Sequence, residues 1–112
     1  MGISVEQFRA LARACPDAVE GAHHGHADFR AGGRVFASLH PDKVTAMVRV
    51  GPREQASLLA RSDAFRPASG AWGRAGCTLV ELAEVSEALA RDALAAAWQH
   101  AVATAARSAA KK

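Results

Sequence analysis

Three histidines within four residues are the first feature of the sequence that could do chemistry. The segment EGAHHGHADFR, residues 20–30, contains His23, His24 and His26, with Asp28 two positions further on. In an extended chain His24, His26 and Asp28 project from one face, and two imidazoles with a carboxylate can hold a divalent metal. No further cluster supplies the closing ligands, so we predict no metal or other cofactor and keep the metal site as an alternative. We expect His24 to hydrogen-bond nearby backbone and His26 to be solvated.

The potential nucleophiles lack the neighbours that catalysis requires. The sequence contains no GxSxG, Walker or HExxH motif, and neither Cys15 nor Cys77 has an adjacent base. The two cysteines share no ligand-type spacing, which predicts reduced thiols. We therefore predict a protein that is not an enzyme and has no catalytic residues. Turnover in a broad hydrolase or transferase screen, lost on substitution of His24, would contradict this.

Positive charge is concentrated in the middle of the chain. The whole sequence has a formal net charge of +3, but residues 29–80 contain eight cations and three acids. Seven of these eight cations are arginines, whose planar fork makes bidentate contacts with phosphate. The arginine codon preference of a GC-rich genome is an alternative explanation. The pattern favours a phosphate-binding surface.

We predict that basic strands and loops form this surface and that DNA is the partner. A twisted sheet edged by basic loops can follow a phosphate backbone, and Trp72 beside Arg74 can stack on a base or enter a groove. Since Phe36 and Met47 share the predicted face of Arg34 and Arg49, helices could instead cover it. The candidate nucleic-acid-binding residues are Arg34, Lys43, Arg49, Arg53, Arg66, Trp72 and Arg74.

A different class of function remains open. The glycine-rich segment ASGAWGRAG, residues 68–76, could place Trp72 as one wall of a pocket against His24 and the first hairpin. The alternative function is therefore a small-molecule or protein-interaction module. Trp72 could also plug the core instead of binding a ligand.

The elements that must position these residues can be read from periodicity and turn signals. Ser4 with Gln7 forms a capping box that starts a helix ending at Cys15, before Pro16. Strands over 26–30 and 34–40 flank Gly32-Gly33, and a third strand over 43–50 follows, which predicts an antiparallel meander. The remaining predicted elements are a short helix from Pro52, an edge strand over 63–67, a strand over 77–82 and a long alanine-rich helix capped by Ser86.

This order, α-β-β-β-α-β-β-α, predicts the α+β class: a twisted antiparallel sheet of about five strands packed against N- and C-terminal helices. A chain of 112 residues fits one domain, residues 1–112. No stretch approaches the roughly 20 apolar residues of a membrane span, and the first residues lack a signal-peptide pattern. We therefore expect a cytoplasmic protein without a membrane partner. The sequence does not define the oligomeric state; we favour a monomer.

Seven residues of the segment HGHADFRAGGRVFASLH carry a family resemblance: His24, Gly25, Phe29, Gly33, Arg34, Phe36 and Ala37. Together with Cys15-Pro16, Trp72-Gly73 and Trp98, they make the chain resemble the YjbR-like (MmcQ/YjbR) family over nearly its whole length. The resemblance implies a curved antiparallel sheet backed by helices, similar to frataxin-like and double-wing domains. It also implies DNA binding, by analogy of fold. We expect this binding to be weak and of low sequence specificity.

The resemblance has two qualifications. Cys77 stands near a position where relatives often have a second aromatic, which leaves Trp72 as the stacking surface. Frataxin-like iron binding depends on an acidic ridge, whereas Glu6, Asp17 and Glu20 are few and scattered here. We therefore do not predict iron binding.

Overall fold

The computed structural model describes residues 2–23, 26–42 and 44–110. Within these ranges the helices are α1 (Val5–Arg13), α2 (Pro52–Arg61), α3 (Gly70–Arg74) and α4 (Glu87–Ala110). The strands are β1 (Val19–His23), β2 (His26–Ala31), β3 (Arg34–Leu39), β4 (Thr45–Arg49), β5 (Phe65–Pro67) and β6 (Cys77–Glu81).

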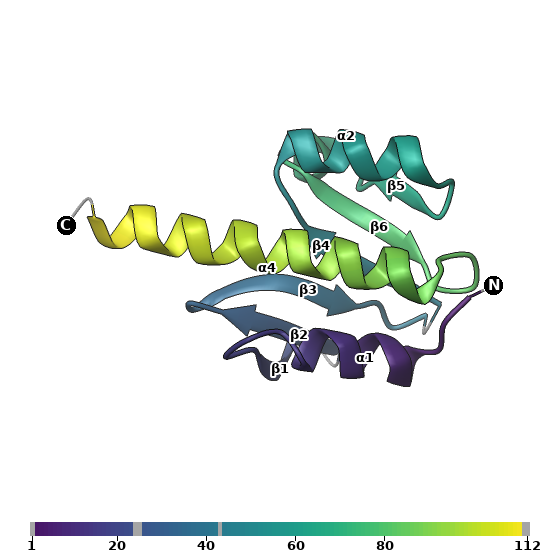
Figure 1. Cartoon of the computed structure of the whole chain (residues 1–112), viewed down its shortest axis with the longest axis horizontal. Helices are drawn as coiled ribbons and strands as arrows, with labels where there is room; N and C mark the ends of the chain where they lie inside the picture. Colours follow the sequence, from purple (N-terminus) through teal and green to yellow (C-terminus); the bar gives the residue numbers. More distant parts are fainter. Residues whose placement is uncertain (1, 24–25, 43, 111–112) are drawn as a thin grey trace.

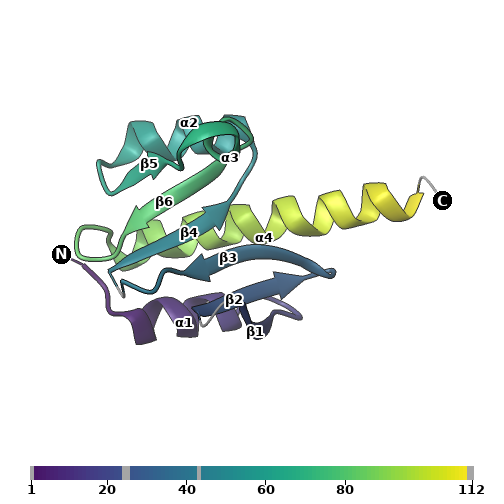
Figure 2. The same cartoon turned by 180° about the vertical axis from the view of Figure 1, so that it is seen from behind.

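The six strands form one antiparallel sheet in the order β1-β2-β3-β4-β6-β5. Helices α1, α2 and α4 lie on one side of this sheet (Figure 1), and the view from behind shows the strands in front of them (Figure 2). The predicted α+β class and helix-backed antiparallel sheet are confirmed. In the part of the chain that the structure describes, no helix is both long and apolar enough to cross a membrane.

Two elements were not predicted. Residues 19–23, expected to be a polar loop, form the edge strand β1, so the sheet has six strands instead of about five. Its sequence, VEGAH, has no clear alternation of apolar and polar residues. Val19 is 64% exposed, and the backbone pairing with β2 defines the strand. The glycine-rich segment contains the short helix α3. The predicted start of α1 is confirmed: Ser4 Oγ accepts from Gln7 N at 3.0 Å, and Gln7 Oε1 accepts from Ser4 N at 2.7 Å.

The core lies between the sheet and the helices. Phe8 of α1 meets Phe29 of β2 edge to face, with ring centroids 6.3 Å apart. Trp98 of α4 donates from Nε1 to the Pro16 carbonyl oxygen at 2.8 Å, which ties the long helix to the segment after α1. Small side chains let α4 pack closely on the sheet; its buried residues are Ala90, Ala93, Leu94, Ala97 and Ala101.

A β-bulge interrupts the alternation of β3. Phe29 of β2 lies opposite Ala37, but the next residue, Arg30, lies opposite Val35, so Phe36 is an additional residue. Phe36 and Ala37 are both fully buried. The strict alternation predicted over residues 34–40 is therefore wrong at this point.

The bulge moves Arg34 to the other face of the sheet. Arg34 lies opposite Ala31, which is buried and two residues from Phe29 on the helix-covered face. We predicted that Arg34 and Arg49 share the outward face of neighbouring strands. This is wrong for Arg34, because one additional residue reverses the side-chain alternation beyond it.

Candidate nucleic-acid interface

The strands β3 and β4 separate at one end of the molecule, and several predicted cations lie there. Their pairing runs from Leu39↔Ala46 to Ala37↔Val48, and beyond it the two strands diverge with α4 behind the gap (Figure 2). Arg34 at the start of β3 and Arg49 at the end of β4 line one small cavity of about 40 Å³ against α4. Arg34 and Arg49 lie on opposite faces of the sheet, but both side chains reach this cavity, at the point where β3 and β4 diverge.

The start of α2 and the whole of α3 lie at the same end of the molecule. Arg53 stands in the first turn of α2, directly after β4, and α3, which carries Trp72 and Arg74, leads into β6 beside the end of β4. Here we call this set the basic end: Arg34, Arg49, Arg53, Trp72 and Arg74.

Trp72 is presented on a firmly held helix. It is 64% exposed, and the Arg49 guanidinium carbon lies 5.8 Å from its ring centroid, within cation–π range. The buried Gln55 of α2 donates from Nε2 to the carbonyl oxygens of Gly73 at 3.0 Å and Cys77 at 3.1 Å. These bonds fix α3 against α2, so the tryptophan is a preformed stacking surface and does not plug the core.

The glycines around Trp72 permit close packing. A Cβ on Gly73 would stand 1.8 Å from the carbonyl oxygen of Ala68. Gly76 has a φ of +114°, and a Cβ there would stand 1.9 Å from the carbonyl oxygen of Val50. This segment is therefore a tightly packed turn between β5 and β6, in which Gly73 and Gly76 have no room for a side chain.

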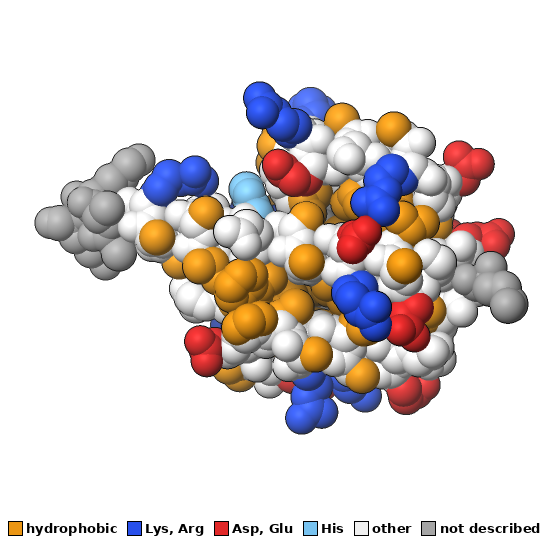
Figure 3. All heavy atoms as spheres, in the orientation of Figure 1, with side chains coloured by type: hydrophobic (Ala, Val, Ile, Leu, Met, Phe, Trp, Pro, Cys, Tyr) orange, Lys and Arg blue, Asp and Glu red, His pale blue; other side chains and the backbone are white. Residues whose placement is uncertain are grey.

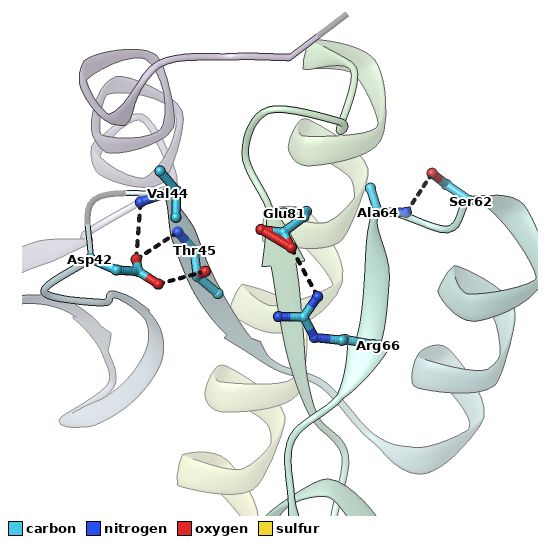
Figure 4. Close-up of polar contacts among 7 residues, drawn as sticks. All are labelled: Asp42, Val44, Thr45, Ser62, Ala64, Arg66 and Glu81. Atoms are coloured by element: carbon cyan, nitrogen blue, oxygen red, sulfur yellow. Dashed lines mark hydrogen bonds and ion pairs between the residues drawn. The ribbon is translucent and has the colours of Figure 1, made fainter.

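One predicted interface residue that the structure describes lies apart from the basic end. Arg66 of β5 is directed toward Glu81 of the neighbouring strand, and their Nη1 and Oε2 atoms form an ion pair of 2.8 Å (Figure 4). Its charge is therefore already compensated. Lys43 lies outside the described residues.

Sequence reasoning missed the contribution of α4. Neither His100 nor Arg107 was among the predicted interface residues. His100 lines the small cavity with Arg34 and Arg49, and Arg107 lines a shallow neighbouring groove of about 330 Å³ with His100 and Glu54. The spacing of His100, Thr104 and Arg107 on one helix face was the sequence signal that could have revealed this contribution.

Most acidic side chains visible in Figure 3 lie towards the end of the molecule opposite the basic end, where the N-terminus is.

The metal site considered above includes His24, which lies outside the described residues. Among the described side chains, no group of three His, Cys, Asp or Glu could hold a metal ion. Asp28 accepts instead from Arg30, with both contacts at 3.3 Å. His26, which we expected to be solvated, is partly buried, and its Nδ1 has no hydrogen-bond partner among these residues.

Both cysteines are free thiols, as predicted. Burial raises the pKa of Cys15, and it raises the pKa of Cys77, where the nearby Arg49 charge partly opposes the effect. A raised pKa lowers the thiolate fraction at neutral pH, so neither thiol is an activated nucleophile.

A pocket between the Trp72 segment and the first hairpin was also predicted. That hairpin is formed by β2 and β3, whereas α3 connects β5 and β6, with β4 between the two pairs of strands. Trp72 is 64% exposed, and His24, the other predicted wall of the pocket, lies outside the described residues.

Together, these features define a class: a helix-backed antiparallel α+β domain with an exposed aromatic residue among arginines. The YjbR family profile matches residues 13–100, and the chain belongs to the YjbR family. The crystal structure of a protein from Pseudomonas syringae is similar in fold, with a TM-score of 0.70 and 16% sequence identity over 88% of this chain and 99% of the other. A search of curated proteins found no match.

Proposed function

We propose that the protein is a non-enzymatic DNA-binding domain whose basic end contacts phosphates with little sequence preference. The observation that carries the proposal is Trp72, 64% exposed on a fixed helix with Arg49 over its ring. A rigid exposed indole offers a stacking or wedging surface that accepts any base. The neighbouring guanidinium groups supply sequence-independent contacts with phosphate.

The arrangement of charge also supports weak binding. The basic end contributes four arginines, and Arg107 and His100 lie beside it on α4. Glu54 stands in the same region and reduces the local surplus of positive charge. We place this activity in the cytoplasm and assign it to a monomer.

Duplex binding at several salt concentrations tests the proposal. If four phosphates are engaged, log K falls against log[salt] with a slope of about −3.6, which is roughly a 150-fold loss of affinity between 50 and 200 mM salt. Substitution of Arg49→Gln or Arg74→Gln should each flatten the slope by about 0.9. Fluorescence anisotropy with a labelled duplex of arbitrary sequence measures both effects.

Arg91→Gln is the matched control, because Arg91 is an exposed α4 arginine paired with Glu87 and distant in sequence from the basic end. It should leave the slope unchanged. Binding that does not depend on salt, an absence of binding at 50 mM salt, or equal effects of all three substitutions would refute the proposal.

The same exposed tryptophan favours one second candidate, a small-molecule or protein-interaction module centred on Trp72. Aromatic residues in this setting are frequent anchors of interfaces. A thermal-shift screen with nucleotides, sugars and metals distinguishes the two functions. A ligand that raises the melting temperature, through a response lost in Trp72→Ala while DNA has no effect, would favour the module.

A further inference from the structure

A groove of about 690 Å³ lies at the opposite end of the molecule from Trp72. The first turn of α1, the start of β2 and the end of β3 form it, and these ends meet on the N-terminal side in Figure 1. Its volume falls within the range of small-molecule sites. Val5, Ala27, Leu39 and Pro41 give it apolar walls.

Donor groups gather on part of this lining. His26 lines the groove, and its buried Nδ1 has no hydrogen-bond partner among the described residues. A buried polar atom of this kind calls for a partner, and in the Nδ1–H tautomer or the imidazolium it donates. Arg9 lines the groove beside it.

The positive charge of Arg9 is only partly compensated. Its Nε lies 3.3 Å from Glu20 Oε2, but the contact lacks hydrogen-bond geometry. The other oxygen of Glu20 lies 3.9 Å from Arg13 Nε, so two guanidinium groups share one carboxylate. Arg9, Arg13 and Glu20 together keep one net positive charge beside the groove, and the positive end of α1 adds to it.

The lining also contains the carboxylate of Glu6, in the first turn of α1. A simple anion would be repelled by Glu6, and a simple cation by Arg9. A ligand that carries both charges meets both groups favourably.

We propose that this groove binds a small zwitterion of the apolar amino-acid type. Its carboxylate accepts hydrogen bonds from Arg9 and, after a rotation of the imidazole that brings the buried Nδ1–H into the groove, from His26. Its ammonium group pairs with Glu6, and its side chain packs against Val5 and Leu39. This site is separate from the basic end and does not depend on DNA binding. The groove is larger than one free amino acid, and water occupies the remaining space.

Amide NMR titration of the full chain tests the proposal with three probes of matched shape: L-leucine, 4-methylpentanoate without the amine, and 3-methylbutylamine without the carboxylate. Leucine should shift the amides of residues 4–9, 26–27 and 39–40 to saturation, with an affinity at least about tenfold above either partial analogue. The His26 ring nitrogen should shift with them. Equal affinity of the three probes, or shifts elsewhere, would overturn the assignment.

Two variants test the contact of the ligand carboxylate and the contact of its ammonium group separately. His26→Phe should lower leucine affinity at least about tenfold, whereas His100→Phe, the matched change beside the basic end, should not. Glu6→Gln alters an exposed side chain, so the fold is expected to tolerate it, and it should weaken leucine binding while it strengthens binding of 4-methylpentanoate. The proposal fails if Glu6→Gln changes both affinities in the same direction, or if His26→Phe binds leucine as the unaltered chain does.

Discussion

Gln55 connects the stability of the domain to the presentation of Trp72, and its replacement by methionine gives a quantitative test. Methionine has nearly the same length but cannot donate, so the bonds to the Gly73 and Cys77 carbonyls are lost. Each carbonyl keeps another donor, Gly76 N at 3.1 Å and Ala68 N at 2.9 Å respectively. Neither oxygen is therefore left without a partner.

The expected cost is then that of two net hydrogen bonds, about 1–3 kcal/mol in the free energy of unfolding. Urea denaturation followed by far-UV circular dichroism measures it, with an unchanged m-value if only the folded state is affected. Because α3 loses its attachment, the Trp72 indole should also become more mobile in heteronuclear NOE measurements, and duplex affinity should fall.

Gln99→Met is the matched control, since Gln99 is an exposed glutamine on α4. It should change stability by less than about 0.5 kcal/mol and leave the Trp72 signal as it was. If Gln55→Met costs no more than this control, or destabilises the protein without loosening the indole, then Gln55 does not hold α3 in the way described.

Three further outcomes follow from the structure. Gly76→Ala should cost more than about 2 kcal/mol of unfolding free energy, because it combines strain at φ +114° with a backbone clash; Gly33→Ala, at positive φ in open space, should cost less in the same urea assay. The backbone hydrogen bond from Val44 holds the pKa of Asp42 below its ordinary value of 3.8 (Figure 4). Its stabilising contribution is therefore complete above that value and is lost as the pH falls through the lower folded-state pKa; urea midpoints for Asp42→Ala should depend less on pH in this interval. Since burial raises the pKa of Cys77, iodoacetamide should label it slowly at pH 8 until urea is added, and rapid labelling of the folded protein would contradict its burial.

The parts of the fold that local chemistry specifies could be predicted from the sequence. The capping box at Ser4, the glycine hairpin after β2 and the long helix after Ser86 each depend on residues close together in the chain. Residues 19–23 could not be assigned in this way, because backbone pairing with β2 stabilises β1 and its side chains give little periodic signal. The bulge at Phe36 was equally hidden, since residues 35–37 are apolar throughout and their pattern does not show which residue is additional.

The candidate site was predicted in its residue types and only partly in its geometry. Arg49, Trp72 and Arg74 were chosen for their chemistry, and the structure brings them to one end through the pairing of β4 with β6. The sequence could not show that Arg66 lies outside the basic end, because its ion pair with Glu81 depends on the register of β5 and β6. His100 joins through the path of α4 across the sheet, which no local pattern encodes.

The short pairing between β3 and β4 divides the sheet into two leaves of three strands each, β1-β2-β3 and β4-β6-β5. Since α4 packs on strands of both leaves, its alanine face keeps the two leaves aligned. A bulky side chain at Ala97, which is completely buried, would push α4 away from both leaves. The leaf that carries Trp72 would then swing relative to the leaf that carries His26, which makes α4 the element through which the two ends of the molecule are mechanically joined.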